Sequence, residues 1–412
     1  MIVATLQKAD RWLGIPLCFA LTCLRGLLAR STVPASAPLR NLLLVKLAEQ
    51  GSTVLAYAAL RRAAELVGRE NVYFITFEDN RFILDVLGVV PEANVIAVSA
   101  ETFPTLLRSA LGAIKRLRRL NLDAAIDMEF FSRGSAALTF LSGAGRRVGF
   151  HAFFGAGPYR GNLMTHRLLY NPHLHTSQTF QTLVEALRCD AAALPTCGLT
   201  PPPADHQPPQ FAPRPDELAQ VKDIVRRETG GQPPLILLNP NASDLLPLRR
   251  WPPQRYVDLT KRLLAKFPDA WVGFTGARNE TQATAELVRE VGSVRCVSFA
   301  GKTTLRQLLV LYTLADVLVT NDSGPAHFAT VTPIQVVTLF GPETPALFAA
   351  RSPRNSVLWA GLICSPCVNA YNNRQSPCRN NLCLQAITVD QVFAETCRAY
   401  EQGVRSRSTG AR

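Results

Sequence analysis

Short apolar runs alternating with helical patterns restrict the fold of this chain more than any other feature of its sequence. The alternation starts near residue 42 and fills two halves, which a proline-rich stretch over 194–215 separates. Because parallel strands need a crossover connection, this order favours doubly wound parallel sheets. The sequence therefore predicts an α/β protein with two Rossmann-like doubly wound domains that face a cleft.

The expected elements follow from the apolar periodicity of each segment. We expect strands over 42–45, 72–76, 95–98, 124–126, 235–238, 271–275, 294–298, 317–320 and 336–339. We expect helices over 53–67, 81–87, 106–120, 176–188, 254–267 and 389–400, and another whose apolar face starts at Leu305. No short repeat indicates a solenoid.

Composition fits a two-domain globular protein. The chain has 412 residues, of which 47% are hydrophobic and 18% charged, enough to bury substantial cores. Its net charge of +13 predicts attraction to an anionic surface. Since the sequence has no nucleic-acid module and no basic run interleaved with aromatic residues, a membrane or glycolipid ranks above nucleic acid as a partner.

The first 38 residues contain the one membrane-like element of the sequence. An apolar run over 12–24 is flanked by basic residues: Lys8, Arg11, Arg25 and Arg30. The run is shorter than the roughly 20 residues that span a bilayer. A secretory signal is an alternative, because Ala35-Ser36-Ala37 resembles a cleavage site, although Pro16 interrupts the run. We expect a helix that lies on the inner face of the membrane or packs on the protein.

Four of the ten cysteines are clustered: Cys364, Cys367, Cys378 and Cys383. Two close pairs across a short loop can bring four thiolates into a tetrahedron, so the spacing predicts a structural zinc site. The segment between the pairs is polar and rich in turn residues, and a metal would supply its order. An iron–sulfur site, disulfides and reduced thiols without a ligand are alternatives.

The turn Asp322-Ser323-Gly324 follows an apolar run and precedes a segment that can start a helix. Backbone N–H groups at a helix N-terminus bind phosphate, Ser323 adds a hydroxyl, and Gly324 lets a ligand approach the backbone closely. His327, on the first helical turn, is positioned to contact a diphosphate oxygen. The alternative is an Asp N-cap with a histidine that faces the core.

Further motifs surround this turn in order: Asn239-Pro240-Asn241-Ala242-Ser243, Arg249-Arg250-Trp251-Pro252, Phe299-Ala300-Gly301-Lys302-Thr303 and Phe340-Gly341-Pro342. Gly301-Lys302-Thr303 is not a P-loop, because Cys296 stands where the Walker pattern needs a glycine. The ordered set resembles family 9 glycosyltransferases, the heptosyltransferases of lipopolysaccharide core assembly. The resemblance covers roughly residues 41–395.

The resemblance implies the GT-B architecture, in which the C-terminal half binds a nucleotide-diphosphate sugar and the N-terminal half binds the acceptor. It implies donor-binding roles for Asp322, Ser323, Gly324, His327, Ser243, Arg249, Arg250 and Lys302. Arg249 or Arg250 would neutralise the leaving diphosphate, as basic side chains do in metal-independent enzymes, so no cofactor is expected for catalysis. The alternative for Trp251-Pro252 is a packed helix start with both arginines solvated.

The loop after the first strand departs from the family pattern. Heptosyltransferases carry Gly-Asp there, and the resemblance implies that this Asp is the general base on the acceptor hydroxyl. In this chain Ser52 occupies the position, and a serine cannot act as a base without a partner. Glu49 on the same loop is the candidate catalytic substitute, and Lys46 matches a basic family position. A surface glutamate before a glycine turn is the alternative for Glu49.

Five parts make up the expected domain scheme. They are an apolar segment over 1–38, an acceptor-side domain over 39–200, a linker over 201–215, a donor domain over 216–388 that includes the cysteine cluster, and a C-terminal helix and basic tail over 389–412. The resemblance implies an inverting, metal-independent glycosyltransferase. Its donor would be a nucleotide-diphosphate sugar, with ADP-linked heptose as a candidate, and its acceptor a lipopolysaccharide-core or other lipid-linked saccharide. The implied location is the cytoplasm, at the inner face of the inner membrane.

Two other functions stay open. The replacement of the family Asp by Ser52 fits a non-catalytic member that binds nucleotide sugars or acts as a scaffold. A nucleotide-sugar epimerase with the same architecture is the other.

Overall fold

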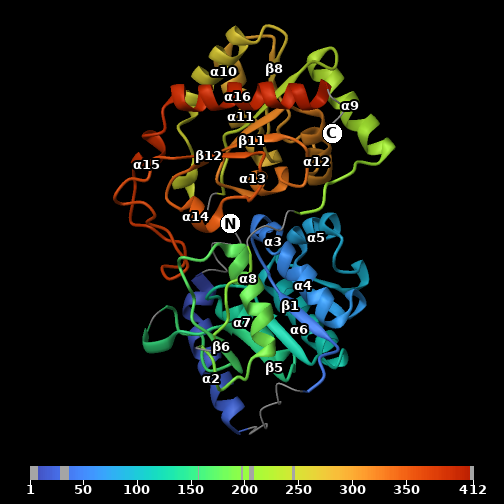
Figure 1. The fold of residues 1–412 in the computed structure, drawn as a ribbon, viewed down its shortest axis with the longest axis vertical. Helices are drawn as coiled ribbons and strands as arrows, with labels where there is room; N and C mark the ends of the chain where they lie inside the picture. Colours follow the sequence, from blue (N-terminus) through green and yellow to red (C-terminus); the bar gives the residue numbers. More distant parts are fainter. Residues whose placement is uncertain are drawn as a thin grey trace. The chain divides into compact units, whose positions relative to one another are not determined.

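Figure 1 shows the fold in a computed structural model, coloured along the sequence. The structure describes residues 8–27, 37–155, 157–195, 198–203, 208–243 and 246–408, so Arg30, Ala35 and Ser36 lie outside the described residues. The chain divides into two compact units. Unit 1 is Met1–His206 with Asn369–Arg374, and unit 2 is Gln207–Val368 with Gln375–Arg412.

Unit 1 is built on a six-stranded parallel sheet in the order β3-β2-β1-β4-β5-β6. Its strands are β1 (Leu42–Val45), β2 (Val72–Phe77), β3 (Val95–Val98), β4 (Ala124–Asp127), β5 (Arg146–Phe150) and β6 (His166–Leu168). All four residues of β1 are apolar and buried, because helices cover both faces of this central strand. The strand order reverses between β1 and β4. Ligands of doubly wound proteins bind at such a switch point, beyond the carboxyl ends of the strands.

The helices of unit 1 are α2 (Gly14–Leu27), α3 (Gln50–Leu55), α4 (Tyr57–Val67), α5 (Arg81–Leu87), α6 (Phe103–Arg119), α7 (Arg133–Leu141) and α8 (Thr176–Glu185). Single 3-10 turns are η1 (Arg69–Asn71), η2 (Glu78–Asn80), η3 (Glu92–Asn94), η4 (Phe153–Gly155) and η5 (Ala186–Arg188). One buried cluster joins Leu117 of α6 and Leu138 of α7 to Leu43 of β1. The helices α6 and α7 therefore cover the same face of the sheet.

The N-terminal apolar run forms α2, which packs on α7 through Cys18 and Leu21. Just before α2, Asp10 caps the start of α7. Its Oδ1 accepts hydrogen bonds from the backbone N–H of Arg133 at 2.9 Å and of Gly134 at 2.7 Å. The expectation that this segment packs on the protein is confirmed. Among the residues that the structure describes, no helix is long and apolar enough to cross a membrane.

Unit 2 contains a second six-stranded parallel sheet, in the order β12-β11-β10-β7-β8-β9. Its strands are β7 (Leu235–Asn239), β8 (Trp271–Phe274), β9 (Cys296–Ser298), β10 (Val317–Asn321), β11 (Gln335–Phe340) and β12 (Asn355–Trp359). The switch point of this sheet lies between β7 and β10. The buried core includes apolar residues of β7, β8, β10 and β11.

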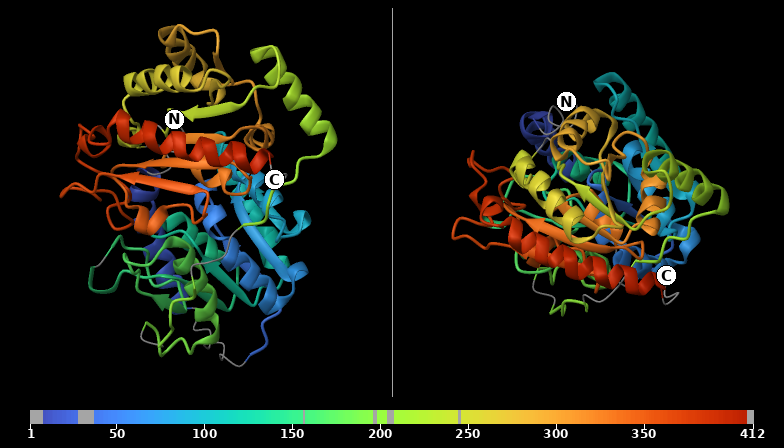
Figure 2. Two further views of the ribbon diagram at one scale, coloured as in Figure 1. Left: turned by 45° about the horizontal axis from the view of Figure 1, so that its top comes forward. Right: turned by 90° about the horizontal axis from the view of Figure 1, so that it is seen from above.

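The helices of unit 2 are α9 (Pro215–Thr229), α10 (Pro253–Lys266), α11 (Thr281–Val291), α12 (Leu305–Leu314), α13 (Gly324–Ala329), α14 (Pro345–Phe348), α15 (Leu382–Gln385) and α16 (Val389–Ser408), with 3-10 turns η6 (Pro247–Arg249) and η7 (Arg278–Glu280). The long C-terminal helix α16 lies along the sheet of unit 2 (Figure 2).

The predicted fold of two doubly wound parallel sheets is confirmed. Sequence analysis missed three strands, β5, β6 and β12, which lie at or next to the sheet edges. These strands carry polar residues such as Arg147 and Asn355, so they lack the continuous apolar run of a central strand. The helix expected over 53–67 is divided into α3 and α4 at Ala56.

Candidate active site

A pocket opens in unit 2 at the carboxyl ends of β7 and β10, where the strand order reverses. Its volume is ≈ 380 Å³, within the range of sites for small ligands. The pocket is lined by Asn239, Asn241, Ala242, Ser243, Gly276, Ala277, Arg278, Glu280, Thr303, Thr304, Leu305, Leu308, Ser323, Gly324, Pro325 and Phe328. Its position matches the place where doubly wound domains bind nucleotides.

Three residues that were expected to hold a diphosphate line this pocket together: Ser243, Ser323 and Gly324. Ser323 is the N-cap of α13, and its hydroxyl donates to the Asn321 carbonyl at 3.2 Å. A side chain at Gly324 would put its Cβ 3.3 Å from the Phe328 ring, so glycine keeps this wall open. Hydroxyl groups beside accessible backbone suit a ligand rich in oxygen, such as a phosphate.

Asn321, at the end of β10, forms hydrogen bonds with the segment that follows β7, which also lines the pocket. Its side-chain oxygen accepts a hydrogen bond from the Trp251 N–H at 3.0 Å, and its amide donates to the Pro240 carbonyl at 2.9 Å. Asn321 is fully buried, so these bonds are shielded from water. Sequence analysis assigned no role to this residue. A buried asparagine at a strand end was the signal for its structural role.

Arg249 lies between two buried carboxyl groups, and one of them belongs to Asp322, next to the pocket wall. Its Nη1 is 3.9 Å from Asp322 Oδ2 and 3.6 Å from Glu343 Oε2, and it donates to the Asp322 carbonyl at 3.2 Å. The side chains of Asp322 and Glu343 are only 4% and 1% exposed. Sequence analysis missed Glu343. Its position just beyond the Gly-Pro loop that ends β11 was the available signal.

The surroundings of these two carboxyl groups raise both pKa values, but to different extents. Burial raises the pKa of Asp322, while Arg249 acts in the opposite direction. Burial also raises the pKa of Glu343 well above its usual range, and the charge of Asp322 adds to the rise. The pKa of Glu343 is raised more strongly, so Glu343 is the more readily protonated of the two, and Arg249 lies within 4 Å of both carboxyl groups.

The other residues expected at the donor site do not line the pocket. Arg250 donates to the Ala242 carbonyl from Nε and Nη2, at 3.2 and 2.7 Å, and so holds the loop that carries Ser243. Lys302 Nζ is 2.6 Å from Glu228 Oε2 in a partly exposed ion pair. His327 is buried on α13, in keeping with the core-facing alternative. Their contacts with a donor stay predictions.

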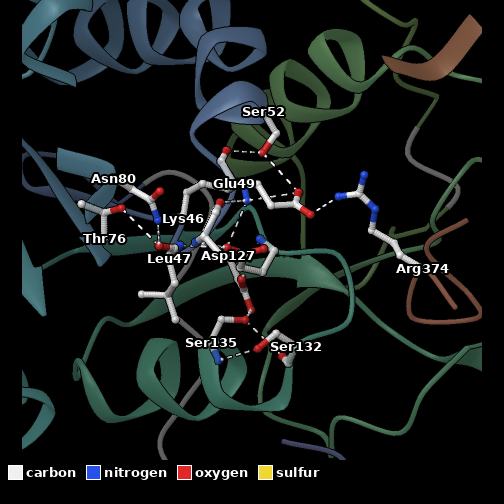
Figure 3. Close-up of polar contacts among 12 residues, drawn as sticks. Lys46, Leu47, Glu49, Ser52, Thr76, Asn80, Asp127, Ser132, Ser135 and Arg374 are labelled. Atoms are coloured by element: carbon white, nitrogen blue, oxygen red, sulfur yellow. Dashed lines mark hydrogen bonds and ion pairs between the residues drawn. The ribbon is translucent and has the colours of Figure 1, made fainter. Parts of the chain in front are cut away.

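The switch point of unit 1 carries the loop that was expected to supply the base (Figure 3). Lys46 is buried, and its Nζ donates to Glu129 Oε1 at 3.1 Å. Burial lowers the pKa of Lys46, and Glu129 opposes this change. Glu129 Oε1 also accepts the backbone N–H of Leu47 at 2.8 Å and of Ala48 at 3.0 Å. Glu129 therefore fixes the loop that follows β1.

Glu49 lies beside Lys46 and Ser52, so the structure brings the three predicted catalytic residues together (Figure 3). Its carboxylate is 39% exposed, forms an ion pair with Arg374, and lies 4.0 Å from Lys46 Nζ. The Ser52 hydroxyl is 3.5 Å from Glu49 Oε2 and donates to the Glu49 carbonyl at 2.8 Å. Glu49 has a left-handed backbone (φ 67), which is uncommon for a residue with a side chain. Such conformations cluster at functional sites.

Asp127, at the end of β4, is a further buried carboxyl group that sequence analysis missed. It pairs with Arg160, accepts a hydrogen bond from Ser135 Oγ at 3.0 Å, and accepts the Glu129 N–H at 3.0 Å. Burial raises its pKa to about 6. A polar residue directly after the apolar run 124–126 was the signal. Asp127 is fully buried, so it stabilises the loop of Glu129 through the hydrogen bond from the Glu129 N–H and is not itself accessible to a ligand.

The four clustered cysteines differ in their exposure. Cys364 and Cys378 are exposed, Cys367 is half-buried and Cys383 is buried. Burial raises the pKa of Cys383, and the thiols of Cys367 and Cys378 add to this rise. Within the described part of the chain, no three His, Cys, Asp or Glu side chains are arranged to hold a metal ion. The predicted zinc site is thus not seen as a formed ligand set, and it stays a prediction from the spacing.

The segment between the cysteine pairs is ordered by contacts other than a metal. Asn369 Oδ1 accepts the backbone N–H of Tyr371 at 2.9 Å and of Asn372 at 3.1 Å, a local turn. The Tyr371 hydroxyl donates to the Tyr170 carbonyl at 2.8 Å, and its ring packs 5.6 Å from that of Phe131. An asparagine turn and an aromatic contact thus help to order this segment, while the metal that sequence analysis expected there stays a prediction.

Comparison with known proteins identifies the family of the chain. The family model described as "Glycosyltransferase family 9 (heptosyltransferase)" matches residues 111–376, more than half of the chain. Lipooligosaccharide heptosyltransferase 2 of Haemophilus influenzae is 30% identical over 168 residues, which are 38% of this chain and 47% of that protein. The chain thus spans about half the length of this curated relative.

Solved structures resemble the whole fold. The ADP-heptose LPS heptosyltransferase II of E. coli matches with a TM-score of 0.65 and 20% identity, over 88% of this chain and 99% of that one. The E. coli heptosyltransferase WaaC, solved with ADP, matches with a TM-score of 0.58 and 17% identity, over 87% of this chain and 99% of that one. At these sequence identities the structural similarity shows a shared fold only. With the family model matched across both units, the chain belongs to glycosyltransferase family 9, the heptosyltransferase family.

Proposed function

We propose that this protein is an inverting, metal-independent glycosyltransferase that moves heptose from an ADP-linked donor to a lipopolysaccharide-core or other lipid-linked saccharide. Family membership supports the reaction class. The name of the Haemophilus relative supports heptose and a lipooligosaccharide, and the ADP in the E. coli structure supports the nucleotide.

The pocket of unit 2 is the observation that carries this proposal. It lies at a switch point, has a suitable volume, and is lined by Ser243, Ser323 and Gly324. Thr303 and Thr304 supply further hydroxyl groups, and Leu305 and Leu308 supply apolar surface. The hydroxyl-rich wall would hold the diphosphate, and the apolar wall would hold the nucleoside.

Nucleotide binding tests this assignment directly. We expect ADP, present at about a hundredfold over its dissociation constant, to stabilise the protein by about 2.7 kcal/mol. UDP, GDP and CMP should stabilise it less. In Gly276→Val the shift should disappear, because a Cβ at this position already lies 2.8 Å from Asn241 Nδ2 at the pocket wall. Thermal unfolding with each nucleotide measures the effect.

Gly231→Ala is the matched control for this test, since a Cβ there meets no atom within 4 Å. It should keep the full ADP shift. If ADP, UDP, GDP and CMP all leave the unfolding temperature of the wild type unchanged, the donor pocket and the proposed reaction are both wrong.

Glu49 is the proposed general base. Its carboxylate would take the proton of the acceptor hydroxyl as that oxygen attacks the anomeric carbon, and the sugar–phosphate bond would break on the opposite face. Its partial exposure leaves it accessible, and Lys46 and Arg374 hold it in place on the loop after β1. Ser52 lies within 3.5 Å of this carboxylate, at the position of the family aspartate.

We expect Glu49→Gln to lower kcat at least about a hundredfold, because general bases contribute typically 10²–10⁴-fold. KM for the donor should change little, since the donor pocket lies in unit 2. Steady-state kinetics with ADP-heptose and a heptose-accepting core saccharide measures both constants. The control is Glu65→Gln, an exposed glutamate of α4 that should keep full turnover. Unchanged kcat in Glu49→Gln would exclude Glu49 as the base.

A non-catalytic role is the second candidate, and the ion pair between Glu49 and Arg374 favours it, because a paired carboxylate is a weaker base. In this case the wild type would bind ADP without turnover. Ser52→Asp would restore the family carboxylate, so a gain of turnover in that variant would indicate that this chain has lost its base.

A lipid-linked acceptor would bring the protein to the inner face of the inner membrane, which we propose as its location. The net charge of +13 supports attraction to an anionic lipid surface.

A further inference from the structure

The helix α6 exposes an apolar stripe along its outer side. Phe103, Leu107 and Leu111 follow one another at a spacing of four residues and are 62%, 54% and 58% exposed. Residues spaced by four lie on one side of a helix. The adjoining side of α6 is buried, because Ala113 and Leu117 pack on the sheet. This stripe therefore adds nothing to the core of unit 1.

The helix α2 has a second apolar surface that the fold leaves exposed. Its inner side packs on α7 through Cys18 and Leu21. Large apolar side chains remain on its outer side and at its ends: Trp12, Leu13, Ile15, Leu17, Phe19, Leu24 and Leu27. Trp12, Phe19 and Leu27 are 74%, 61% and 83% exposed. Apolar side chains gathered in this way mark interaction sites more often than scattered ones do.

Both surfaces belong to the same side of unit 1. The helices α6 and α7 share one face of the sheet through the cluster of Leu43, Leu117 and Leu138, and α2 covers α7. Arg118 Nε of α6 donates to the Leu141 carbonyl at the end of α7, at 2.9 Å, which joins these neighbours. In the right-hand view of Figure 2, the blue α2 and the teal α6 lie along the same side. We name the exposed residues of α2 and α6 together the α2–α6 face.

Within α2 and α6 every charged residue is basic, while Asp10 precedes α2 and the exposed Glu101 precedes α6. The helix α6 contains four arginines and one lysine and no acidic residue: Arg108, Lys115, Arg116, Arg118 and Arg119. All five are exposed. The helix α2 also lacks acidic residues, and exposed Lys8 and Arg11 precede it. Apolar side chains beside exposed cations are the composition of a surface that enters the headgroup region of an anionic bilayer.

We propose that unit 1 binds an anionic phospholipid bilayer through the α2–α6 face, with the apolar stripes entering the interface and the basic residues contacting the headgroups. A second copy of the chain fits this face less well, because two such faces would bring like charges together. This inference depends on the proposed function in one respect, namely that the acceptor is linked to a lipid. It is tested with lipid alone, so its failure would leave donor binding and transfer untouched.

The experiment is flotation of the full chain with vesicles of phosphatidylethanolamine and phosphatidylglycerol, compared with phosphatidylcholine vesicles. The protein should float with the anionic vesicles, and added salt should weaken the binding. Leu107→Glu with Leu111→Glu should lower binding at least about tenfold, and so should Trp12→Ser with Phe19→Ser. These side chains are exposed, so the variants should fold, which an unchanged ADP shift and unfolding temperature would verify.

Val294→Glu is the matched control, because Val294 is equally apolar and exposed but lies in unit 2. It should float like the wild type. If the wild type fails to float with anionic vesicles, or if both double variants float as well as it does, the α2–α6 face does not bind lipid. Light scattering without lipid measures whether the protein forms a dimer through this face. A dimer that the α6 variant dissociates would mark the face as a contact between copies and overturn the bilayer proposal.

Discussion

Arg249→Ala is expected to lower the free energy of unfolding by about 3–5 kcal/mol at neutral pH, the range seen when one partner of a buried ion pair is removed. Arg249 is the cation between Asp322 and Glu343, and both carboxyl groups are almost completely buried. Its loss would leave Asp322 ionised without a counter-charge, or force it to take up a proton. Urea unfolding of the variant and the wild type measures the difference.

The loss of unfolding free energy in Arg249→Ala should depend on pH, and the two buried carboxyl groups determine the direction of this dependence. Asp322 and Glu343 have raised pKa values in the folded protein, so their stabilising contribution is complete below their unfolded pKa values. It is lost as the pH rises through the folded values. Without Arg249 the folded-state pKa values of both carboxyl groups rise further, so the loss of stability at neutral pH becomes larger. The difference in stability between variant and wild type should therefore be smaller at about pH 5 than at about pH 7.5.

Two variants separate this cause from a general loss of packing. Arg255→Ala removes another guanidinium of unit 2, whose Nη1 donates to the Gln385 and Ile387 carbonyls, and it should show no such pH dependence. Combining Arg249→Ala with Glu343→Gln removes one of the two titrating groups and should restore part of the stability. If Arg249→Ala costs less than 1 kcal/mol, or the same at both pH values, the carboxylates do not depend on Arg249.

Trp251→Ala should destabilise the protein by a similar amount, about 3–5 kcal/mol, through the cavity it leaves. The indole is fully buried and packs edge-on against Tyr256, with ring centres 5.0 Å apart. Its Nε1 donates to the Ile387 carbonyl at 2.9 Å, which links α10 to the chain just before α16. Chemical unfolding measures the loss, and hydrogen exchange should show α16 opening more often.

Trp251→Phe is the graded control for this prediction. It keeps most of the ring volume and loses the N–H, while Arg255 Nη1 still donates to the Ile387 carbonyl at 2.7 Å. Its cost should be about 1–2 kcal/mol. Trp359→Ala should cost less still, because that ring is 38% exposed on the edge strand β12. Equal losses at positions 251 and 359 would contradict the cavity argument.

The sequence predicts which turns form the pocket of unit 2 better than it predicts the burial of individual side chains, for a physical reason. Ser243, Ser323 and Gly324 lie in turns at the carboxyl ends of buried strands, and parallel strands of one sheet bring such turns together. The apolar runs alone therefore determine which loops meet. Burial of individual side chains does not follow from that rule. His327 is buried on α13 and Lys302 pairs with Glu228, so neither lines the pocket, and their contacts with a ligand stay predictions.

By itself the sequence determined the two doubly wound sheets, the turns at their switch points and the family, because these depend on local periodicity and short motifs. Only the tertiary structure decided the charge partners. Glu343 meets Asp322 across two neighbouring strands, Glu129 fixes the loop of Lys46 from 83 residues away, and Arg374 pairs with Glu49 from 325 residues away. Such pairs have no periodicity or spacing along the chain, since they form only where folding encloses the charges and an unpaired buried charge would be costly.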